Sequence, residues 1–280
     1  MNYLSACLII KNEEKYLREW IDYHIKAGVE KFFIYENESD NQEETRKIIN
    51  EYGDLIIYHE IKGAGIQNSV YNHCIENYKN DSRWIAMIDT DEFIVPKKIG
   101  LKDAISRYEE FPAIGINWLM FGSNGHEKVY DENYSVLKRF TKCCKINKET
   151  DYSIETKDFN NSVHIKSIVD PKKVLYFPNP HFAIYADNKL ACDENYNLID
   201  GKNYKINFAG TRHVSHDIFQ INHYNLKSWE EFKLRKAYKT PDRLTFHEQY
   251  LPENLRNTFD RENKYCNEIE NLDIFKILGE

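Results

Sequence analysis

Short apolar runs alternate with amphipathic stretches over the first third of the chain. Uninterrupted apolar runs of strand length are typical of parallel strands that are covered on both faces. The runs are residues 4–10, 32–35, 55–58 and 84–88. Between them, helical spacing of apolar residues predicts helices that follow Asn12, end at Gly28 and Gly53, and open at Gly63-Ala64-Gly65. Residues 1–96 therefore predict the order β-α-β-α-β-α-β, the pattern of an α/β fold with right-handed crossovers.

Each of these strands ends in polar residues. The polar clusters are residues 11–13, 36–40 and 89–92. In open α/β sheets, ligands bind beyond the carboxyl ends of the strands. We therefore expect the three clusters to converge on one crevice.

The pattern is less regular after Pro96. Further strand candidates are residues 113–118 and 174–177, and an apolar stretch at 221–224 precedes a helix from about Ser228 to Tyr238. Residues 129–160 and 186–210 are polar and mixed, and the last forty residues are helical in pattern and charged. This predicts a second, less regular half followed by a helical extension.

Composition narrows the class of protein. The formal net charge of −7 argues against general nucleic-acid binding, which needs a basic face to displace phosphate counterions. Six irregularly spaced cysteines favour neither a disulfide scaffold nor a zinc site, and the adjacent Cys143 and Cys144 are typical of small buried residues. No run approaches the roughly 18 apolar residues of a membrane span, and the first ten residues lack a basic leader pattern. These features favour a cytoplasmic protein, with the inner face of the cell membrane as an alternative location.

The sharpest chemical signal is the Asp89-Thr90-Asp91 triplet, which directly follows an apolar strand. Alternate residues of an extended chain point the same way, so Asp89 and Asp91 are expected to face one target. Two neighbouring carboxylates repel unless a cation lies between them, and oxygen ligands suit Mg²⁺ or Mn²⁺, which bridge to phosphates. The alternative is an acidic turn that merely ends a strand.

A second signal is His223, with Lys227 four residues later. A neutral imidazole completes a metal shell, and a lysine ammonium stabilises a departing diphosphate. The structural alternative is a helix N-terminus, because Ser228 and Glu231 have the spacing of a capping box.

Taken together, the motifs resemble one enzyme family. The motifs are Lys11-Asn12-Glu13, Tyr16-Leu17-x-Glu19-Trp20-Ile21-x-Tyr23-His24, Tyr35-x-Asn37-x-Ser39, Asp89-x-Asp91-Glu92-Phe93, Phe121-Gly122-Ser123-x-Gly125-His126, Lys166-Ser167-Ile168-Val169, His181-Phe182 and Asn222-His223-Tyr224-x-x-Lys227-Ser228. Over about residues 3–236 they resemble GT-A type glycosyltransferases of family 92 and their bacterial family-2-like relatives.

The resemblance implies a GT-A (Rossmann-like), mostly parallel sheet flanked by helices and a nucleotide-sugar-dependent transferase with Mn²⁺ or Mg²⁺ at the Asp-x-Asp motif. The nucleotide-sugar-binding residues are then expected to be Lys11, Glu13, Asn37, Asp40, Gln67, Asn72, Asp89, Thr90 and Lys166. The metal ligands are expected to be Asp89, Asp91 and His223, with His181 as a rival to His223. Lys227 is expected to stabilise the leaving diphosphate.

The acceptor side is expected to follow the strand at 113–118. The candidate acceptor residues are Trp118, Gly122, Ser123, His126 and His181. Family members are typically inverting, which requires a carboxylate base beside the acceptor hydroxyl. Glu127, Asp193 and Asp217 are the candidates, and Asp217 is favoured because it is near His223 in the sequence.

These inferences predict a glycosyltransferase that moves a hexose from a UDP-sugar to a glycan or lipid-linked saccharide of surface polysaccharide biosynthesis, with peripheral membrane contact as an alternative. A preference for galactose is implied only by the resemblance. The expected division is a GT-A domain over 1–240, with a nucleotide-sugar half over 1–96 and an acceptor half over 97–240, followed by an extension over 241–280. Two alternatives stay open: a non-catalytic nucleotide-sugar or carbohydrate-binding module, and a haloacid-dehalogenase-like phosphatase with Asp89 as nucleophile.

Overall fold

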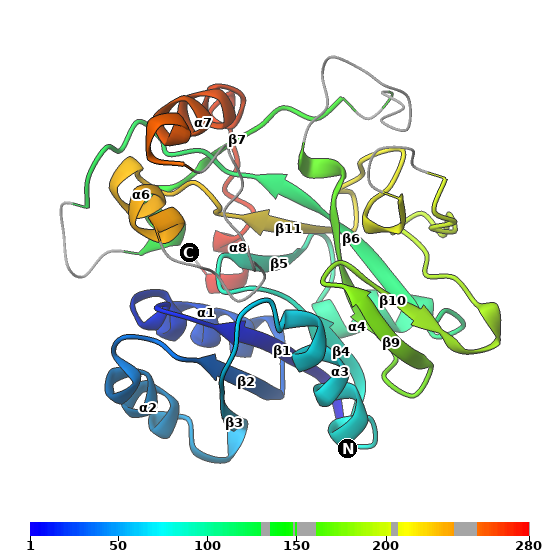
Figure 1. The fold of residues 1–280 in the computed structure, drawn as a ribbon. Helices are drawn as coiled ribbons and strands as arrows, with labels where there is room; N and C mark the ends of the chain where they lie inside the picture. The colour runs from blue at the N-terminus through cyan, green and yellow to red at the C-terminus, as the bar shows by residue number, and fades with distance from the viewer. Residues whose placement is uncertain (130–134, 148, 150–160, 203–206, 238–250, 280) are drawn as a thin grey trace.

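The protein is an α/β structure built on one eight-stranded sheet (Figure 1). A computed structural model describes residues 1–129, 135–147, 149, 161–202, 207–237 and 251–279. The predicted fold class is confirmed: in the described chain the sheet has four parallel and three antiparallel strand pairings, with helices packed on both faces. Of the stretch 129–160, expected to be polar and mixed, residues 130–134, 148 and 150–160 lie outside the described residues.

The first half has the predicted order. Its elements are β1 (Asn2–Ile10), α1 (Glu14–Ala27), β2 (Lys31–Asn37), α2 (Gln42–Glu51), β3 (Ile56–Ile61), α3 (Gln67–Tyr78) and β4 (Ser82–Met87). The strands pair in parallel in the order β3-β2-β1-β4. Gly28 ends α1 as predicted, with a left-handed φ of 107°. The expected cap at Asn12 is wrong by one residue, because Glu13 is the N-cap of α1 and Asn12 itself has φ 56°.

The second half contains elements that the pattern did not predict. Its elements are β5 (Glu92–Pro96), α4 (Leu101–Ile105), β6 (Ala113–Met120), α5 (Val136–Arg139), β7 (Lys142–Cys143), β8 (Ile165–Val169), β9 (Val174–Asn179), β10 (Phe182–Tyr185), β11 (Phe219–His223), α6 (Trp229–Ala237), α7 (Pro252–Tyr265), β12 (Ile269–Glu270) and α8 (Phe275–Leu278). The strands β5, β8 and β10 were not expected. All three are short. Pro96 ends the apolar run of β5, Lys166 interrupts that of β8, and a flanking loop bounds the four residues of β10.

The sheet is strongly curled. Its order is β3-β2-β1-β4-β8-β6-β11-β5, so β4 and β5 are four strand spacings apart, about 19 Å on a flat sheet. Only residues 88–91 connect them, and a connection of that length spans at most about 17 Å. The sheet must therefore bend so that β5 returns toward the first half, where it packs against α1.

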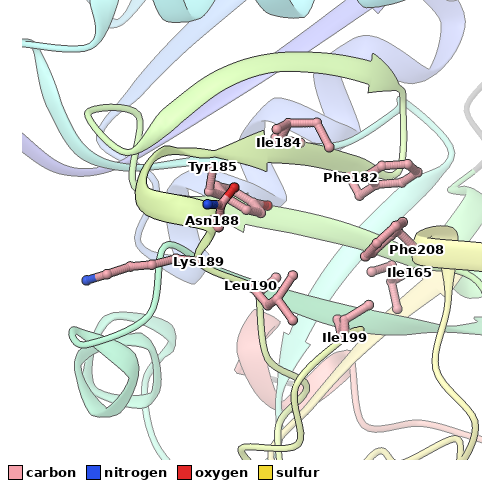
Figure 2. A pocket seen from close by; sticks show the side chains of 11 residues that line it. Ile165, Phe182, Ile184, Tyr185, Asn188, Lys189, Leu190, Ile199 and Phe208 are labelled. Atoms are coloured by element: carbon pink, nitrogen blue, oxygen red, sulfur yellow. The ribbon is translucent and has the colours of Figure 1, made fainter. Parts of the chain in front are cut away.

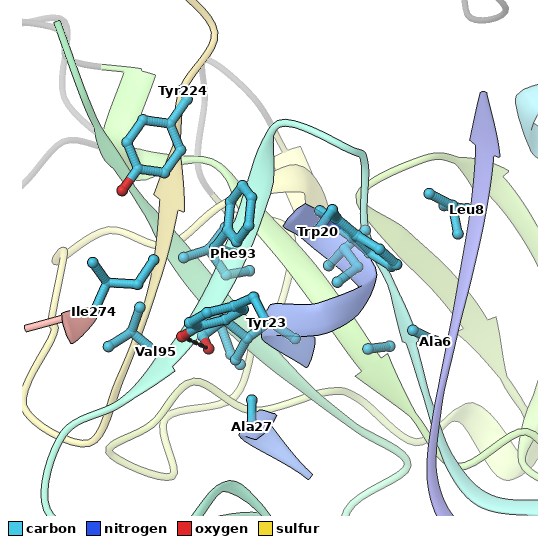
Figure 3. Close-up of a cluster of buried hydrophobic side chains, with 14 of the residues drawn as sticks. Ala6, Leu8, Trp20, Tyr23, Ala27, Phe93, Val95, Tyr224 and Ile274 are labelled. Atoms are coloured by element: carbon cyan, nitrogen blue, oxygen red, sulfur yellow. Dashed lines mark hydrogen bonds between the residues drawn. The ribbon is translucent and has the colours of Figure 1, made fainter. Parts of the chain in front are cut away.

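Aromatic side chains of α1 fill the space that this curl encloses (Figure 3). Trp20 and Tyr23 are buried among Phe93 of β5 and Tyr224 beyond β11. Their polar atoms are satisfied by the backbone of β5: Trp20 Nε1 donates to the Glu92 carbonyl oxygen and Tyr23 Oη to that of Ile94, both at 2.8 Å. This core fixes the start of β5 and thus the segment that carries the aspartates.

The C-terminal segment from 251 packs on the same core. Leu255, Phe259, Cys266 and Ile274 are buried in it, and β12 pairs with β7. The expected helical character of this segment is confirmed, whereas the division of the chain at residues 96 and 240 stays a prediction. Within the described ranges, none of the helices combines the length and the apolar character that crossing a bilayer requires.

Candidate active site

The two aspartates lie in a tight turn at one edge of the sheet. The carboxyl ends of β4, β6 and β11 meet there with the amino ends of the antiparallel strands β5 and β8. The Glu92 N–H donates to the Asp89 carbonyl oxygen at 3.0 Å, so residues 89–92 turn instead of continuing the strand. The expectation that Asp89 and Asp91 face one target is therefore wrong, because a turn sends alternate side chains in different directions.

Asp89 is neutralised by a buried lysine. Lys166 Nζ lies 2.8 Å from Asp89 Oδ2, and Gln67 Nε2 donates to Asp89 Oδ1 at 2.8 Å. Lys166 is 1% exposed, and although burial lowers its pKa, Asp89 and Glu92 raise it well above the usual value. Lys166 and Gln67, both predicted to bind the nucleotide sugar, thus belong to the site but hold Asp89.

Glu92 is a further buried carboxyl that sequence reasoning did not single out. One oxygen accepts the Asp89 N–H at 2.9 Å and lies 3.6 Å from Lys166 Nζ. Burial raises the pKa of Glu92 well above its usual value, partly opposed by Lys166. Its other oxygen is buried without a hydrogen-bond partner among the described residues.

Asp91 faces a different pair of groups. Arg235 Nη1 donates to Asp91 Oδ2 at 2.5 Å, and His223 Nε2 lies 3.4 Å from the same oxygen. Burial alone would raise the pKa of Asp91, but the Arg235 guanidinium and His223 hold it well below its usual value. Burial lowers the pKa of His223, which favours the neutral imidazole that binds metals. Arg235 could not be singled out from the sequence, because one arginine in the last turn of a helix usually only complements the helix dipole.

Lys227 is a buried cation beside Asp91. It is 3% exposed, has a left-handed φ of 53°, and its Nζ lies 4.3 Å from the ring centroid of Tyr16. Burial lowers its pKa, while Asp91 and Glu13 oppose the shift. Non-glycine residues in this backbone region are strained and concentrate at functional sites. The capping-box alternative is also correct, since Ser228 and Glu231 bond reciprocally, and it orients the helix that follows Lys227.

Glu13, beside Thr90, belongs to the same group as Asp91, Lys227 and Arg235. Burial raises the pKa of Glu13, and Lys227 and Arg235 oppose the shift. Glu13 Oε2 has no hydrogen-bond partner within the described ranges. The polar ends of β1 and β4 therefore converge as predicted.

The ends of β1 and β2 also meet. The Asn12 N–H donates to Ser39 Oγ at 2.8 Å, and Asn12 Nδ2 donates to Asp40 Oδ2 at 3.2 Å. Asn37 Nδ2 donates to the Gly63 carbonyl oxygen at 3.0 Å. Lys11, Asn37 and Asp40 thus lie at the predicted edge, and their binding roles stay predictions.

An aromatic wall stands beside His223. The ring of Trp118, from β6, lies with its centroid 4.2 Å from that of His223 and 5.2 Å from those of His164 and His181. His181 Nδ1 lies 2.8 Å from the Ile165 carbonyl oxygen, and burial lowers the pKa of His181 well below its usual value. Trp118 Nε1 and His223 Nδ1 are buried without partners in the described chain. Two predicted acceptor residues, Trp118 and His181, are therefore brought to the site.

Three other predicted binding residues have structural contacts instead. The Asn72 amide donates to the Phe177 carbonyl oxygen at 3.3 Å and accepts its N–H at 2.6 Å, which fastens β9 to α3. Gly122 packs against the chain after α7, and the Ser123 N–H donates to Asn263 Oδ1 at 2.8 Å. These residues hold elements together, and the binding roles predicted for them stay predictions. His126 lies in the same loop, where its N–H donates to Ser123.

The predicted catalytic bases are not assembled at the site. Asp217 precedes β11 by two residues and lies beyond its amino end, whereas His223 is at the carboxyl end, about 13 Å from Phe219 along the strand, so sequence proximity misled the prediction. Asp193 is at the amino end of β6, where it accepts the N–H groups of Asn195 and Asn197. Glu127 follows the carboxyl end of β6, but both its oxygens accept from Arg256, at 2.8 and 3.0 Å.

The residues support a smaller metal site than predicted. No group of three or more His, Cys, Asp or Glu side chains in the described ranges is arranged to hold a metal ion. Because Asp89 is turned toward Lys166, the predicted three ligands are not assembled in this structure, and the metal set stays a prediction. Asp91 Oδ2 and His223 Nε2 fit a shared ion, since two ligands about 2.1 Å from one ion are roughly 3.0–3.4 Å apart. Substrate oxygens commonly supply the remaining ligands of Mg²⁺-type sites.

A separate cavity of about 210 Å³ lies beside β10 (Figure 2). Among the described residues its lining is mostly apolar, from Ile165, Phe182, Ile184, Leu190, Ile199 and Phe208, with Lys189 as the one charged residue. This lining offers a diphosphate a single lysine among apolar side chains, so the group around Asp91, with Lys227 and Arg235, is the better candidate active site.

Comparison with known proteins identifies the family. The glycosyltransferase family 92 sequence model matches residues 3–262. A family 92 protein of Oryza sativa subsp. japonica is 26% identical over 235 residues, 82% of this chain and 34% of that protein. Galactan beta-1,4-galactosyltransferase GALS2 of Arabidopsis thaliana is 25% identical over 132 residues, 43% of this chain and 25% of that protein. This chain spans about a third or less of the length of these two relatives.

Among solved structures, S. aureus TarS 1–349 in complex with UDP aligns with a TM-score of 0.43 and 18% identity over 92% of this chain and 72% of that one. The sequence match to the family covers nearly all of the chain and includes every residue of the group around Asp91. The chain belongs to glycosyltransferase family 92.

Proposed function

We propose that this protein transfers a hexose from a UDP-sugar to a hydroxyl of a glycan, with a divalent metal ion bound at Asp91 and His223. The single observation that carries the proposal is the shared geometry at Asp91 Oδ2: a carboxylate and an imidazole 3.4 Å apart, with Lys227 and Arg235 beside them. This combination of a hard-cation site and buried basic groups suits a diphosphate leaving group.

Mn²⁺ or Mg²⁺ would be held by Asp91 and the neutral His223, and when bound it supplies positive charge to the leaving diphosphate. Negative charge on that group grows as the glycosidic bond breaks. Lys227 would also stabilise the leaving diphosphate, because Tyr16 and the capped start of α6 hold its position. Its charge stabilises the transition state more than the ground state, which is the condition for catalysis.

The nucleoside would lie over the carboxyl ends of β1 and β2. Lys11, Asn37 and Asp40 offer a cation, an amide and a carboxylate there, and Glu13 and Thr90 connect this edge to Asp91. Trp118 and His181 would face the sugars beyond His223, where the flat indole ring suits the apolar face of a hexose.

Transfer with inversion needs a carboxylate that accepts the proton of the acceptor hydroxyl. Of the three candidates, only Glu127 follows a strand end at the edge of the site, so it is the one that enters the proposal. Arg256 lowers the pKa of Glu127, so Glu127 would have to leave Arg256 before it could act as a base.

Galactose is the first sugar to test. Two relatives that are 25% identical over 132 residues are galactan beta-1,4-galactosyltransferases of Arabidopsis thaliana. The match to each covers 43% of this chain.

The test is a UDP-release assay with UDP-galactose, UDP-glucose and UDP-N-acetylglucosamine, a panel of oligosaccharide acceptors, and Mn²⁺ or EDTA. We expect one donor to be consumed only with metal present. Asp91→Asn should lower turnover by at least about 10³-fold, because it removes a metal ligand and a charge that acts on the reacting groups.

The matched control is Asp217→Asn, which removes an exposed carboxylate at the far end of β11 and should leave turnover unchanged. Full turnover of Asp91→Asn would contradict the assignment, and full wild-type turnover in EDTA would contradict the metal. Tight UDP-sugar binding without release of UDP, with every acceptor, would favour the non-catalytic binding module.

A further inference from the structure

Arg235 occupies the oxygen that the proposed metal ion requires. Its Nη1 lies 2.5 Å from Asp91 Oδ2, the same atom that His223 Nε2 faces. A guanidinium 2.5 Å from this oxygen repels a divalent ion that binds the same oxygen. The arginine and the metal are therefore competitors for Asp91.

We propose that Arg235 is the resting counter-ion of the metal site and moves from Asp91 to the donor diphosphate when metal and nucleotide bind together. The inference rests on the proposed function, because it takes Asp91 and His223 as the metal ligands. It gives Arg235 a role in binding the diphosphate and predicts that the metal ion binds weakly on its own and more tightly when the nucleotide is present.

The contacts of Arg235 make the exchange feasible. Nη1 carries two hydrogens but faces three acceptors: Asp91 Oδ2, the Asn225 carbonyl oxygen at 3.2 Å and Asn225 Oδ1 at 3.0 Å. When Asp91 is released, Asn225 still anchors Nη1. The side chain is 27% exposed, so it has room to turn toward a ligand at the surface of the site.

The charge balance of the site predicts the coupling. Among the described residues, Glu231 also acts on Lys227 but is paired with Arg139, which leaves the carboxyl groups of Glu13 and Asp91 facing Lys227 and Arg235. A divalent ion added alone would create excess positive charge in a largely buried group, which is unfavourable. A diphosphate brings the missing negative charge, and a guanidinium binds phosphate oxygens through two parallel hydrogen bonds.

The experiment measures Mn²⁺ binding by isothermal titration calorimetry, with and without UDP, for the full chain and for Arg235→Gln. Removing the competitor should tighten binding of Mn²⁺ alone by about tenfold, because a partly buried ion pair no longer has to break. The same substitution should weaken UDP binding in saturating Mn²⁺ by about tenfold, because a phosphate contact is lost. Wild-type protein should bind Mn²⁺ at least about tenfold more tightly with UDP present.

Lys233→Gln is the matched control, since it removes an exposed cation from the same helix and should change neither affinity. Arg235→Met, which keeps the length of the side chain, repeats the test if the glutamine variant does not fold. Mn²⁺ affinity that is unchanged or weaker in the folded Arg235 variants would overturn the exchange and leave the metal site intact. Absence of Mn²⁺ binding to every variant, with UDP present, would instead overturn the metal site and the exchange with it.

Discussion

Lys166 offers the most direct test of how the Asp89 turn is held together. Its ammonium is 1% exposed and lies 2.8 Å from Asp89 Oδ2 and 3.6 Å from Glu92 Oε2. Lys166→Met keeps the length of the side chain but leaves both carboxyl groups without their cation. Breaking a buried ion pair on one side costs about 3–5 kcal/mol. Because Asp89 is about one-third exposed, we expect the lower end, a loss of about 3 kcal/mol in the free energy of unfolding at pH 7.5.

The pH dependence identifies the cause. The folded-state pKa of Glu92 is raised, so the folded protein binds this proton more readily than the unfolded chain, and acidification favours the fold. Without Lys166 the pKa of Glu92 rises further. The loss in Lys166→Met should therefore be smaller at pH 5 than at pH 7.5.

Urea unfolding at both pH values measures the effect, with Lys172→Met, an exposed lysine on the loop after β8, as the control. Adding Glu92→Gln to Lys166→Met removes the buried charge and should recover at least about 1 kcal/mol at pH 7.5. A loss below about 1 kcal/mol in Lys166→Met, or one that neither pH nor Glu92→Gln changes, would refute this electrostatic account.

Two further predictions concern the elements that support the site. Burial alone would raise the pKa of Glu231, but Arg139 and the Ser228 cap lower it to about 2. The contribution of Glu231 to the free energy of unfolding is therefore complete above pH 4.5, is lost as the pH falls toward 2, and is at most about 3 kcal/mol at about 1.4 kcal/mol per pKa unit. Glu231→Gln should accordingly flatten the urea stability profile between pH 5 and 3. A Cβ on Gly122 would lie 2.4 Å from the Cys266 carbonyl oxygen, so Gly122→Ala should lower stability by about 1–3 kcal/mol in thermal unfolding. Gly100→Ala is the control, because the nearest neighbour of a Cβ on Gly100 is at 3.7 Å and stability should not fall. Equal stabilities for the two alanine variants would contradict this packing.

The sequence predicted the parts of the fold whose pattern is local. The strands β1 and β4 are uninterrupted apolar runs because both of their faces are covered, and that pattern survives in the sequence. The strand β8 was not predicted, because the charged Lys166 interrupts its five-residue run. This buried charge is tolerated only because Lys166 pairs with Asp89. No local pattern carries that information.

The same limit applies to the site. The Asp-x-Asp motif, His223 and Lys227 could be found as polar residues after apolar strands, and the structure brings Asp91, His223 and Lys227 together. The contact between Arg235 and Asp91 joins residues far apart in the sequence, and the pairing of β5 with β11, which α6 follows, brings them together. Asp217 shows the reverse error, since an extended strand separates residues that are six apart in the sequence.

The packing of the C-terminal segment has a practical consequence for expression. A shortened version ending near residue 240 would keep every residue of the proposed metal site, yet it would lose Leu255, Phe259, Cys266 and Ile274 from the interior. The apolar side chains that they cover would then face water, a state that promotes aggregation. Trimming at this point should give insoluble material, so a minimal recombinant version should retain the chain through α8.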